Sequence, residues 1–192
     1  LNAAPKFIIL TNREQSYDWY VFGNAIDSTF DERLTLNSNA ASTSSTSAMD
    51  ATAPTSTVFT VGSNAGTNGS GDAQLALCWS EVEGYSKFGS YEGNGDPDGP
   101  FIWCGFKPRW VMVKVTSTTN SWVIVDSKRD TYNIVGQRLR ADLSNAEDTQ
   151  DAVDFVSNGF KIRTDTASTW NDSETYIYCA WAESPFKYSN AR

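Results

Sequence analysis

Short apolar runs of four to seven residues alternate along this chain with clusters of Asn, Asp, Gly, Ser and Pro. Runs of this length that end in turn-forming residues are typical of strands in antiparallel sandwiches. The runs at residues 19–22 (WYVF) and 122–125 (WVIV) are nearly continuous in apolar character, which predicts strands covered on both faces. The pattern therefore favours an all-β protein.

The apolar runs recur with a period of roughly 100 residues, which divides the chain into two similar halves. Five blocks occur in the same order in both halves: residues 5–10 and 108–113, 19–22 and 122–125, 34–37 and 139–142, 58–61 and 159–162, and 75–79 and 177–181. This order predicts an internal duplication into two tandem antiparallel β-sandwich modules, at residues 1–84 and 85–192.

The second half carries an additional leading segment at residues 87–106, which predicts two strands around an acidic, glycine-rich turn. The first half has residues 1–4 ahead of its matching block. We therefore expect that the leading strands of the first module lie upstream in a longer chain, and that its sheet has an open edge.

The polar segments between the blocks predict loops. Residues 37–54 consist almost entirely of Ser, Thr, Asn and Ala, and residues 64–71 have the composition of a Gly/Asn turn. Residues 141–155 are the one segment for which we expect a helical turn, because Ala, Asp and Glu are grouped there.

The composition supports strands and loops and excludes several functions. Ser, Thr and Asn supply 22, 19 and 14 of the 192 residues, and these residue types disfavour long helices. The net charge of −8 argues against a nucleic acid or an anionic membrane as a partner. Because the chain has no His, the usual serine triads, zinc proteases and deaminases are excluded. No segment resembles a signal peptide or a membrane span.

The three cysteines, Cys78, Cys104 and Cys179, are widely spaced and lie among apolar or aromatic neighbours. An odd number at such spacing favours buried free thiols in strands over a disulfide.

Glu81 and Glu83 are the closest pair of carboxylates that sequence alone suggests for catalysis. On a strand, E-x-E would place both side chains on one face about 7 Å apart, which is within the range of glycosidases. Glu81 matches Glu183 in the other half, but Glu83 has no acidic counterpart. A structural role is therefore favoured, and no catalytic residue is assigned.

The glycine-rich turn contains Asn94, Asp96 and Asp98, whose oxygen atoms are of the kind that Ca²⁺ takes. Their spacing does not fit an EF-hand, so a solvated turn is favoured and no metal site or cofactor is assigned. Asp165, together with residues 171–172, is a second group of the same kind.

Several aromatic residues suit stacking on sugar rings. Trp19 and Trp122 lie in apolar runs that recur between the halves, so we expect them in the core. Trp170 lies in a polar loop and is the better candidate for an exposed ligand contact. Other aromatic candidates are Tyr85, Phe88, Phe186 and Tyr188. The predicted ligand contacts are thus Trp170, Asp165, Asn94, Asp96 and Asp98.

Taken together, the blocks resemble tandem modules in tail and virion proteins of tailed bacteriophages, especially marine ones. The most specific parts of the resemblance are EGYSKFGSYEGNG at the junction, GFKPRWVMVK and the ending AESPFKYSNAR. The remaining blocks that carry it are APKFIIL, DWYVF, TLNSNAAS, APTSTVFTVGS, SWVIVDSKRD and DFVSNGFKIRT.

The resemblance implies jelly-roll, lectin-like modules similar to concanavalin-type sandwiches, with no catalytic residues to carry over. It implies a virion structural protein, such as a tail fibre or surface appendage component, that is assembled in the host cytoplasm and contacts other virion proteins. Host surface polysaccharide is the expected ligand and a homotrimer the expected assembly. The alternatives are a capsid decoration or spacer without ligand, and a polysaccharide-degrading enzyme that uses Glu81 and Glu83.

Overall fold

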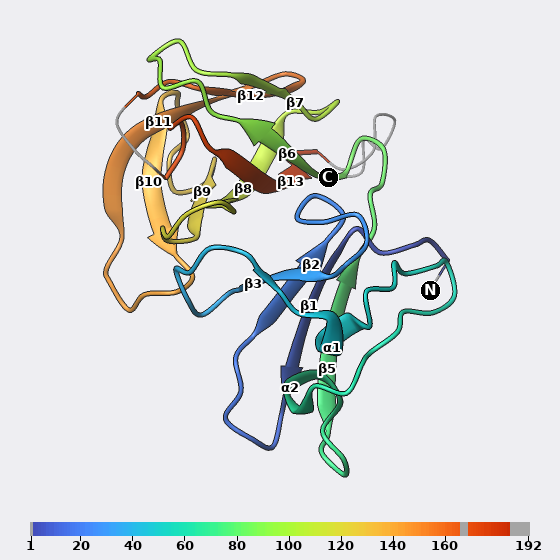
Figure 1. Ribbon diagram of the computed structural model, residues 1–192. Coiled ribbons are helices and arrows are strands. Elements are labelled where there is room, and N and C mark those ends of the chain that lie inside the picture. The colour runs from blue at the N-terminus through green and yellow to red at the C-terminus, as the bar shows by residue number, and fades with distance from the viewer. Residues whose placement is uncertain (1, 166–168, 185–192) are drawn as a thin grey trace. The chain divides into compact units, whose positions relative to one another are not determined.

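The structure is a computed structural model that describes residues 2–165 and 169–184 (Figure 1). By their contacts the residues divide into two units, Leu1–Ser80 and Glu81–Arg192. The repeat pattern of the sequence predicts a boundary after residue 84, whereas the contacts place it after Ser80. Each unit is built on one antiparallel sheet, and the two helices of the described residues are single turns. The protein is therefore all-β, as the apolar pattern predicts.

The first unit is a five-stranded sheet with two short helices. The strand order is β4-β3-β2-β1-β5, and every neighbouring pair is antiparallel. The elements are β1 (Phe7–Asn12), β2 (Tyr20–Gly23), β3 (Glu32–Thr35), β4 (Thr43–Ser44), α1 (Thr46–Met49), α2 (Ala65–Asn68) and β5 (Gln74–Trp79).

One face of this sheet packs on a core that includes α1. The core contains alternate residues of β1 and β2, because successive strand side chains point to opposite faces. Its buried members are Ile8, Leu10, Tyr20, Phe22, Phe30, Ala48 and Met49. Phe59 and Val61 also pack on it, but residues 58–61 form no strand, so that prediction is wrong. This segment instead lies beside α1. The N–H of Gly62, which directly follows it, donates to the carbonyl of Ala48 in α1 at 3.0 Å.

The second unit is an eight-stranded sheet in the order β6-β13-β8-β9-β10-β11-β12-β7. Figure 1 shows this sheet curling strongly toward a barrel. Its strands are β6 (Ser86–Glu92), β7 (Phe101–Trp103), β8 (Pro108–Val115), β9 (Val123–Asp126), β10 (Val135–Arg140), β11 (Asp148–Val156), β12 (Gly159–Ile162) and β13 (Thr175–Ala182). The two strands predicted around the glycine-rich turn are present, as β6 and β7, at opposite ends of this order.

Alternate residues of these strands form the core of the second unit. Its buried members include Val111, Val113, Val115, Phe160, Ile162, Tyr176 and Tyr178. The helical turn expected in residues 141–155 is wrong, because residues from Asp148 onward form β11. Pairing with β10 and β12 on its two sides outweighs the local helix preference of this segment.

The predicted loops also contain short elements. Residues 37–54 include β4 and α1, and residues 64–71 include α2. The Asn64 side chain caps α2 by accepting the N–H of Gly66 at 2.8 Å, as Asn does well at helix starts.

The two sheets share one strand order over four strands. The order β5-β1-β2-β3 in the first unit corresponds to β13-β8-β9-β10 in the second. The pairing register also coincides with the sequence blocks. Corresponding pairs are Phe7↔Trp79 with Trp110↔Trp181, Ile8↔Phe22 with Val111↔Val125, and Val21↔Leu34 with Ile124↔Leu139.

Candidate functional site

The turn that carries Asn94, Asp96 and Asp98 is held together by its own side chains. Asn94 Oδ1 accepts the N–H of Asp96 at 3.1 Å, and Asp96 Oδ1 accepts the N–H of Asp98 at 2.8 Å. Asn94 Nδ2 donates to the carbonyl of Asp98 at 3.2 Å. Asn and Asp favour turns through such bonds to nearby backbone groups. The side chains of Asn94 and Asp96 therefore shape the turn, and their bonded oxygen atoms already have partners.

Asn171 fastens this turn to the loop before β13, and it is fully buried. Its Nδ2 donates to the carbonyls of Asp96 at 2.7 Å and Thr164 at 2.9 Å. Its Oδ1 accepts the N–H of Asn94 at 2.9 Å. The sequence suggests oxygen ligands at residues 171–172 but does not reveal this role of Asn171, because nothing local indicates that the turn 75 residues away lies beside it.

The side chains of Asp98 and Asp165, which are also predicted ligand contacts, are exposed. Asp98 forms an ion pair with Lys161 at 2.7 Å, and this ammonium holds the pKa of the carboxyl below its usual value. Asp165 lies three residues after the end of β12. Within residues 2–165 and 169–184, no group of three or more His, Cys, Asp and Glu is placed to hold a metal ion.

Two of the three tryptophan predictions are wrong. Trp170 is fully buried and contributes to the core, although it was expected to be exposed. Trp19 was expected in the core, but 39% of its surface is exposed. Trp122 is buried, as predicted. Trp19 lies immediately before β2. Trp170 directly precedes Asn171, whose side chain holds this segment in place by donating a hydrogen bond to the carbonyl of Thr164.

The other aromatic candidates also differ in exposure. Tyr85 is 38% exposed, and Phe88 is buried in β6. Phe186 and Tyr188 lie outside the described residues.

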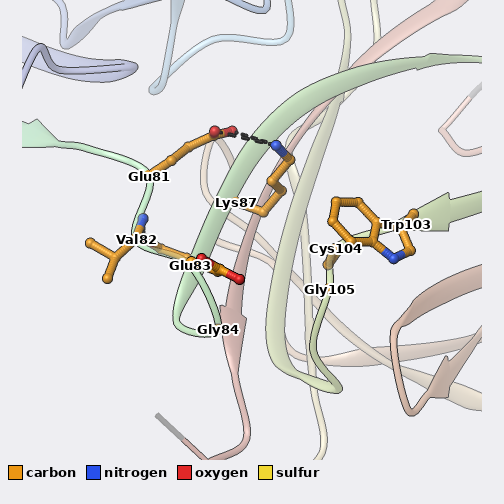
Figure 2. Close-up of a pocket in the computed structure, with 9 residues that line it drawn as sticks. Glu81, Val82, Glu83, Gly84, Lys87, Trp103, Cys104 and Gly105 are labelled. Carbon is orange, nitrogen blue, oxygen red and sulfur yellow. Dashed lines mark hydrogen bonds and ion pairs between the residues drawn. The ribbon is translucent and has the colours of Figure 1, made fainter. Parts of the chain in front are cut away.

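A cavity of about 340 Å³ in the second unit is a site that the sequence did not indicate (Figure 2). It lies where the turn before β6 faces the end of β7, the two edge strands of the sheet. The lining residues are Glu81, Val82, Glu83, Gly84, Ser86, Lys87, Trp103, Cys104 and Gly105.

Trp103 forms an exposed aromatic wall of this cavity, with 60% of its surface open to solvent. Gly105, at φ +81°, lets the indole lie close, because an added Cβ would be 3.1 Å from the ring. The N–H groups of Cys104 and Gly105 both donate to the carbonyl of Asn158, at 2.9 and 3.0 Å. These bonds fix the backbone beneath Trp103. Phe101, two residues earlier on the same face of β7, is 47% exposed.

An ion pair between Lys87 and Glu81, at 3.1 Å, lies on the opposite side of the cavity (Figure 2). Glu81 also accepts the N–H of Phe88 at 3.2 Å. The expectation that Glu81 and Glu83 share one face of a strand is wrong, because β5 ends at Trp79 and Glu83 lies in a turn. Figure 2 shows the two side chains running in different directions.

The cysteines provide no activated nucleophile. All three are free thiols, as predicted; Cys104 and Cys179 are buried, and Cys78 is partly buried in β5. Cys179 lies in β13, whereas Cys104 directly follows β7. Burial raises the pKa of the Cys104 thiol to about 12 and that of Cys179 well above its usual value. Because the thiolate is the reactive form, both stay protonated at neutral pH.

One protein family matches residues 1–185, and it is described as a domain of unknown function, DUF7483. The chain belongs to this family. No curated protein and no solved structure matches the chain. In the part of this DUF7483 chain that the structure describes, no helix has the length and apolar character needed to cross a membrane.

The cavity of the DUF7483 chain therefore combines an exposed indole with one ammonium and two carboxylates. Such a combination suits the binding of a polar ligand that also has an apolar face.

Proposed function

We propose that this chain is a structural protein of a tailed-bacteriophage virion, a tail fibre or surface appendage component that binds host-surface polysaccharide through the cavity at Trp103. The resemblance of its sequence blocks to phage tail and virion modules supports the virion role. The observation that carries the binding role is the exposed indole of Trp103 on a fixed turn, facing the Lys87–Glu81 pair across the cavity.

A sugar ring suits this cavity chemically. The C–H face of a pyranose packs on an indole, while its hydroxyls bond to charged groups at the rim. Lys87 and Glu83 are the groups in position to make such bonds across from Trp103. The volume of about 340 Å³ lies at the small end of ligand sites, which suits one or two sugar residues of a longer chain.

We also propose that the two units are jelly-roll, lectin-like modules that arose by duplication. Their shared strand order and coincident registers support this proposal, and so do corresponding bonds outside the strands. The N–H of Trp19 donates to Asn37 Oδ1 at 2.9 Å, and the N–H of Trp122 donates to Asp142 Oδ1 at 3.0 Å. These two bonds link the same positions of the aligned blocks.

The proposed role is binding without catalysis. The ion pair of Glu81 with Lys87 and the diverging directions of Glu81 and Glu83 argue against a paired acid and nucleophile. The protonated thiol of Cys104 argues against cysteine chemistry in the same cavity. If the chain nevertheless degrades polysaccharide, new reducing ends will accumulate, and Glu81→Gln will abolish them.

Saturable binding of the labelled chain to candidate marine host cells tests the proposal, with intact phage and purified surface polysaccharide as competitors. Trp103→Ala should weaken binding by about fivefold or more, since the comparable stacking of a nucleic-acid base on an aromatic side chain contributes about 1–3 kcal/mol. Trp19→Ala is the matched control, because it removes an exposed indole from the other unit. Equal affinity of both variants would contradict the assignment of the cavity. No binding by a folded chain would instead favour a capsid decoration or a spacer.

The proposed assembly is a homotrimer within the virion. Light scattering of the purified chain should then give about three times the 21.1 kDa of one copy. A monomer at micromolar concentration would contradict self-assembly by this chain.

A further inference from the structure

Two aromatic side chains follow one another on the exposed face of β7. Phe101 is 47% exposed and Trp103 is 60% exposed, while Ile102 between them is buried in the core. Successive strand residues point to opposite faces, so the two rings share one face, and their positions are about 7 Å apart along the strand. Trp103 belongs to the wall of the cavity, and Phe101 continues the same aromatic row toward the start of β7.

Glycines leave room for both rings. In the register of β7 with β12, Gly159 is opposite Trp103. A Cβ at Gly159 would lie 3.2 Å from the ring of Phe101 and would overlap the carbonyl of Ile102. A Cβ at Gly105 would likewise crowd the indole of Trp103. Both rings therefore lie close to the backbone, and a large part of each stays exposed.

Charged side chains border this aromatic row. Lys161 of β12 is opposite Phe101, and Asp154 of β11 is opposite Lys161. Directly opposite residues of antiparallel strands lie on the same face of a sheet, so these charges adjoin the rings. The Lys161 ammonium reaches the start of β7, where it donates to the carbonyl of Gly99 and lies 2.7 Å from the carboxylate of Asp98.

The charges around the two rings favour an uncharged ligand. Lys161 is paired with Asp98 at 2.7 Å, and Lys87 in the cavity is paired with Glu81 at 3.1 Å. Glu83 adds a further carboxylate to the cavity lining. Among these side chains the carboxylates outnumber the ammonium groups, and the whole chain carries a net charge of −8. An anionic ligand would have to compete with these carboxylates for the ammonium groups, because like charges repel.

The size and the border of this surface fit a sugar chain better than a protein surface. Stable protein interfaces involve about 20–30 residues on each side, and their centres are depleted in charged residues. Here two rings directly adjoin ion-paired side chains. A sugar ring has the matching pattern, because its C–H face packs on an aromatic ring while its hydroxyls project toward charged groups at the border.

We propose that Phe101 is a second stacking site for the same ligand, so that the face of β7 binds at least two neighbouring units of an uncharged polysaccharide. One sugar unit stacks on Trp103 in the cavity, and a neighbouring unit stacks on Phe101 with its hydroxyls toward Lys161 and Asp98. This inference rests on the proposed binding of polysaccharide at Trp103. It adds the length of the bound segment and the charge class of the ligand.

The test uses fragments of the purified host surface polysaccharide. Partial acid hydrolysis, followed by separation by charge and by size, gives neutral and acidic fragments from single sugars upward. Titration of the full chain followed by nuclear magnetic resonance measures their affinities. Longer neutral fragments should bind about fivefold or more tightly than single sugars, by analogy with the stacking of a nucleic-acid base on an aromatic side chain. Salt should have little effect on this affinity, because an uncharged ligand leaves no attraction for salt to screen.

Variants of Phe101 provide the matched comparison. Phe101→Leu removes the ring but keeps an apolar side chain on β7. It should weaken the binding of longer fragments by about fivefold or more, while single sugars bind at Trp103 as before. Phe101→Tyr keeps a ring and should bind as the unaltered chain does. Tyr132→Ala is the control, because it removes an 82% exposed ring elsewhere in the same unit.

The outcomes separate this inference from the proposed function. If Trp103→Ala weakens binding but Phe101→Leu does not, the second stacking site is wrong and sugar binding at the cavity stands. Equal affinity for single sugars and longer fragments would also overturn the inference, as would tighter binding of the acidic fragments. Loss of self-association in Phe101→Leu would instead assign the rings to an interface between copies of this chain. If no fragment binds the folded chain, the proposed function and this inference both fail.

Discussion

The hydroxyl of Tyr91 donates a hydrogen bond to the backbone carbonyl of Trp170 at 2.9 Å, and both side chains are buried. This bond connects edge strand β6 to the loop before β13, which lies 79 residues later. The ring of Tyr91 also stacks on Tyr176, with centroids 5.0 Å apart and planes at 8°. The edge of the second sheet and the loop that carries Asn171 are therefore fixed to each other.

Replacing Tyr91 by Phe should destabilise the protein by about 1–2 kcal/mol. The variant retains the stacked ring but leaves the buried carbonyl of Trp170 without this donor. Urea unfolding followed by tryptophan fluorescence measures the change. Tyr132→Phe is the control, since Tyr132 is 82% exposed and its variant should unfold at the unaltered urea concentration. Equal stability of both variants would show that the bond contributes nothing.

Replacing Asn171 by Ala should lower the free energy of unfolding by about 2–4 kcal/mol, because it removes several buried hydrogen bonds at once. It should also free the glycine-rich turn, so the amide of Asn94 should exchange much faster in hydrogen-exchange measurements. Asn94→Ala is the comparison. The hydrogen bonds that Asn94→Ala loses lie within an exposed turn. This variant should therefore lower the free energy of unfolding by less than about 1 kcal/mol. An unchanged exchange rate at Asn94 in Asn171→Ala would refute the fastening role of Asn171.

Lys114 should make the protein more stable as the pH rises from about 8 toward 10.5. Burial lowers the pKa of its ammonium from 10.5 to about 8, although the charge of Asp142 opposes this shift. Between these values the unfolded chain holds more protons than the folded chain, so unfolding becomes less favourable with rising pH. Lys114→Met should be more stable at pH 7 by roughly 1–3 kcal/mol and should lack this rise. Urea unfolding at pH 7, 8.5 and 10 tests both statements.

Asp148 should contribute stability that is lost in acid. Its hydrogen bonds and ion pairs with Arg138 and Arg140 lower its pKa from 3.8 to about 2. This contribution is complete above about pH 4 and disappears as the pH falls through about 2. Because the carboxylate is partly exposed and solvent screens its ion pairs, Asp148→Asn should lower the free energy of unfolding by about 0.5–1 kcal/mol at pH 7. The difference between the variant and the unaltered chain should vanish near pH 2; a constant difference would contradict it.

Strand positions in both units could be predicted from the sequence where an apolar run is flanked by turn residues. The blocks at residues 5–10, 19–22, 75–79 and 177–181 all overlap strands. Residues that match between the two halves also form matching strand pairs. A register shift of one residue would move every side chain to the other face of the sheet, so the alternating pattern and the register agree. The strand predicted at residues 58–61 is absent because Phe59 and Val61 pack on the core that includes α1, and none of the described strands pairs with this segment.

The candidate site was decided by tertiary structure. Trp103 lies in an apolar run and is exposed, whereas Trp170 lies between Thr169 and Asn171 and is buried, so the local sequence does not predict which indole faces solvent. Trp103 is exposed because β7 is a three-residue edge strand with Trp103 and Phe101 on its open face. Trp170 is buried because Asn171 and Tyr91 hold its loop against the core.

The sequence by itself thus determined most of the strand positions and the order in which they recur, because these depend on alternation and turn residues along the chain. Only the tertiary structure decided which strands lie at the edges, which indole faces solvent and that Glu81 and Glu83 diverge. Those properties depend on which strands become neighbours, and that is settled by contacts between residues far apart in the sequence.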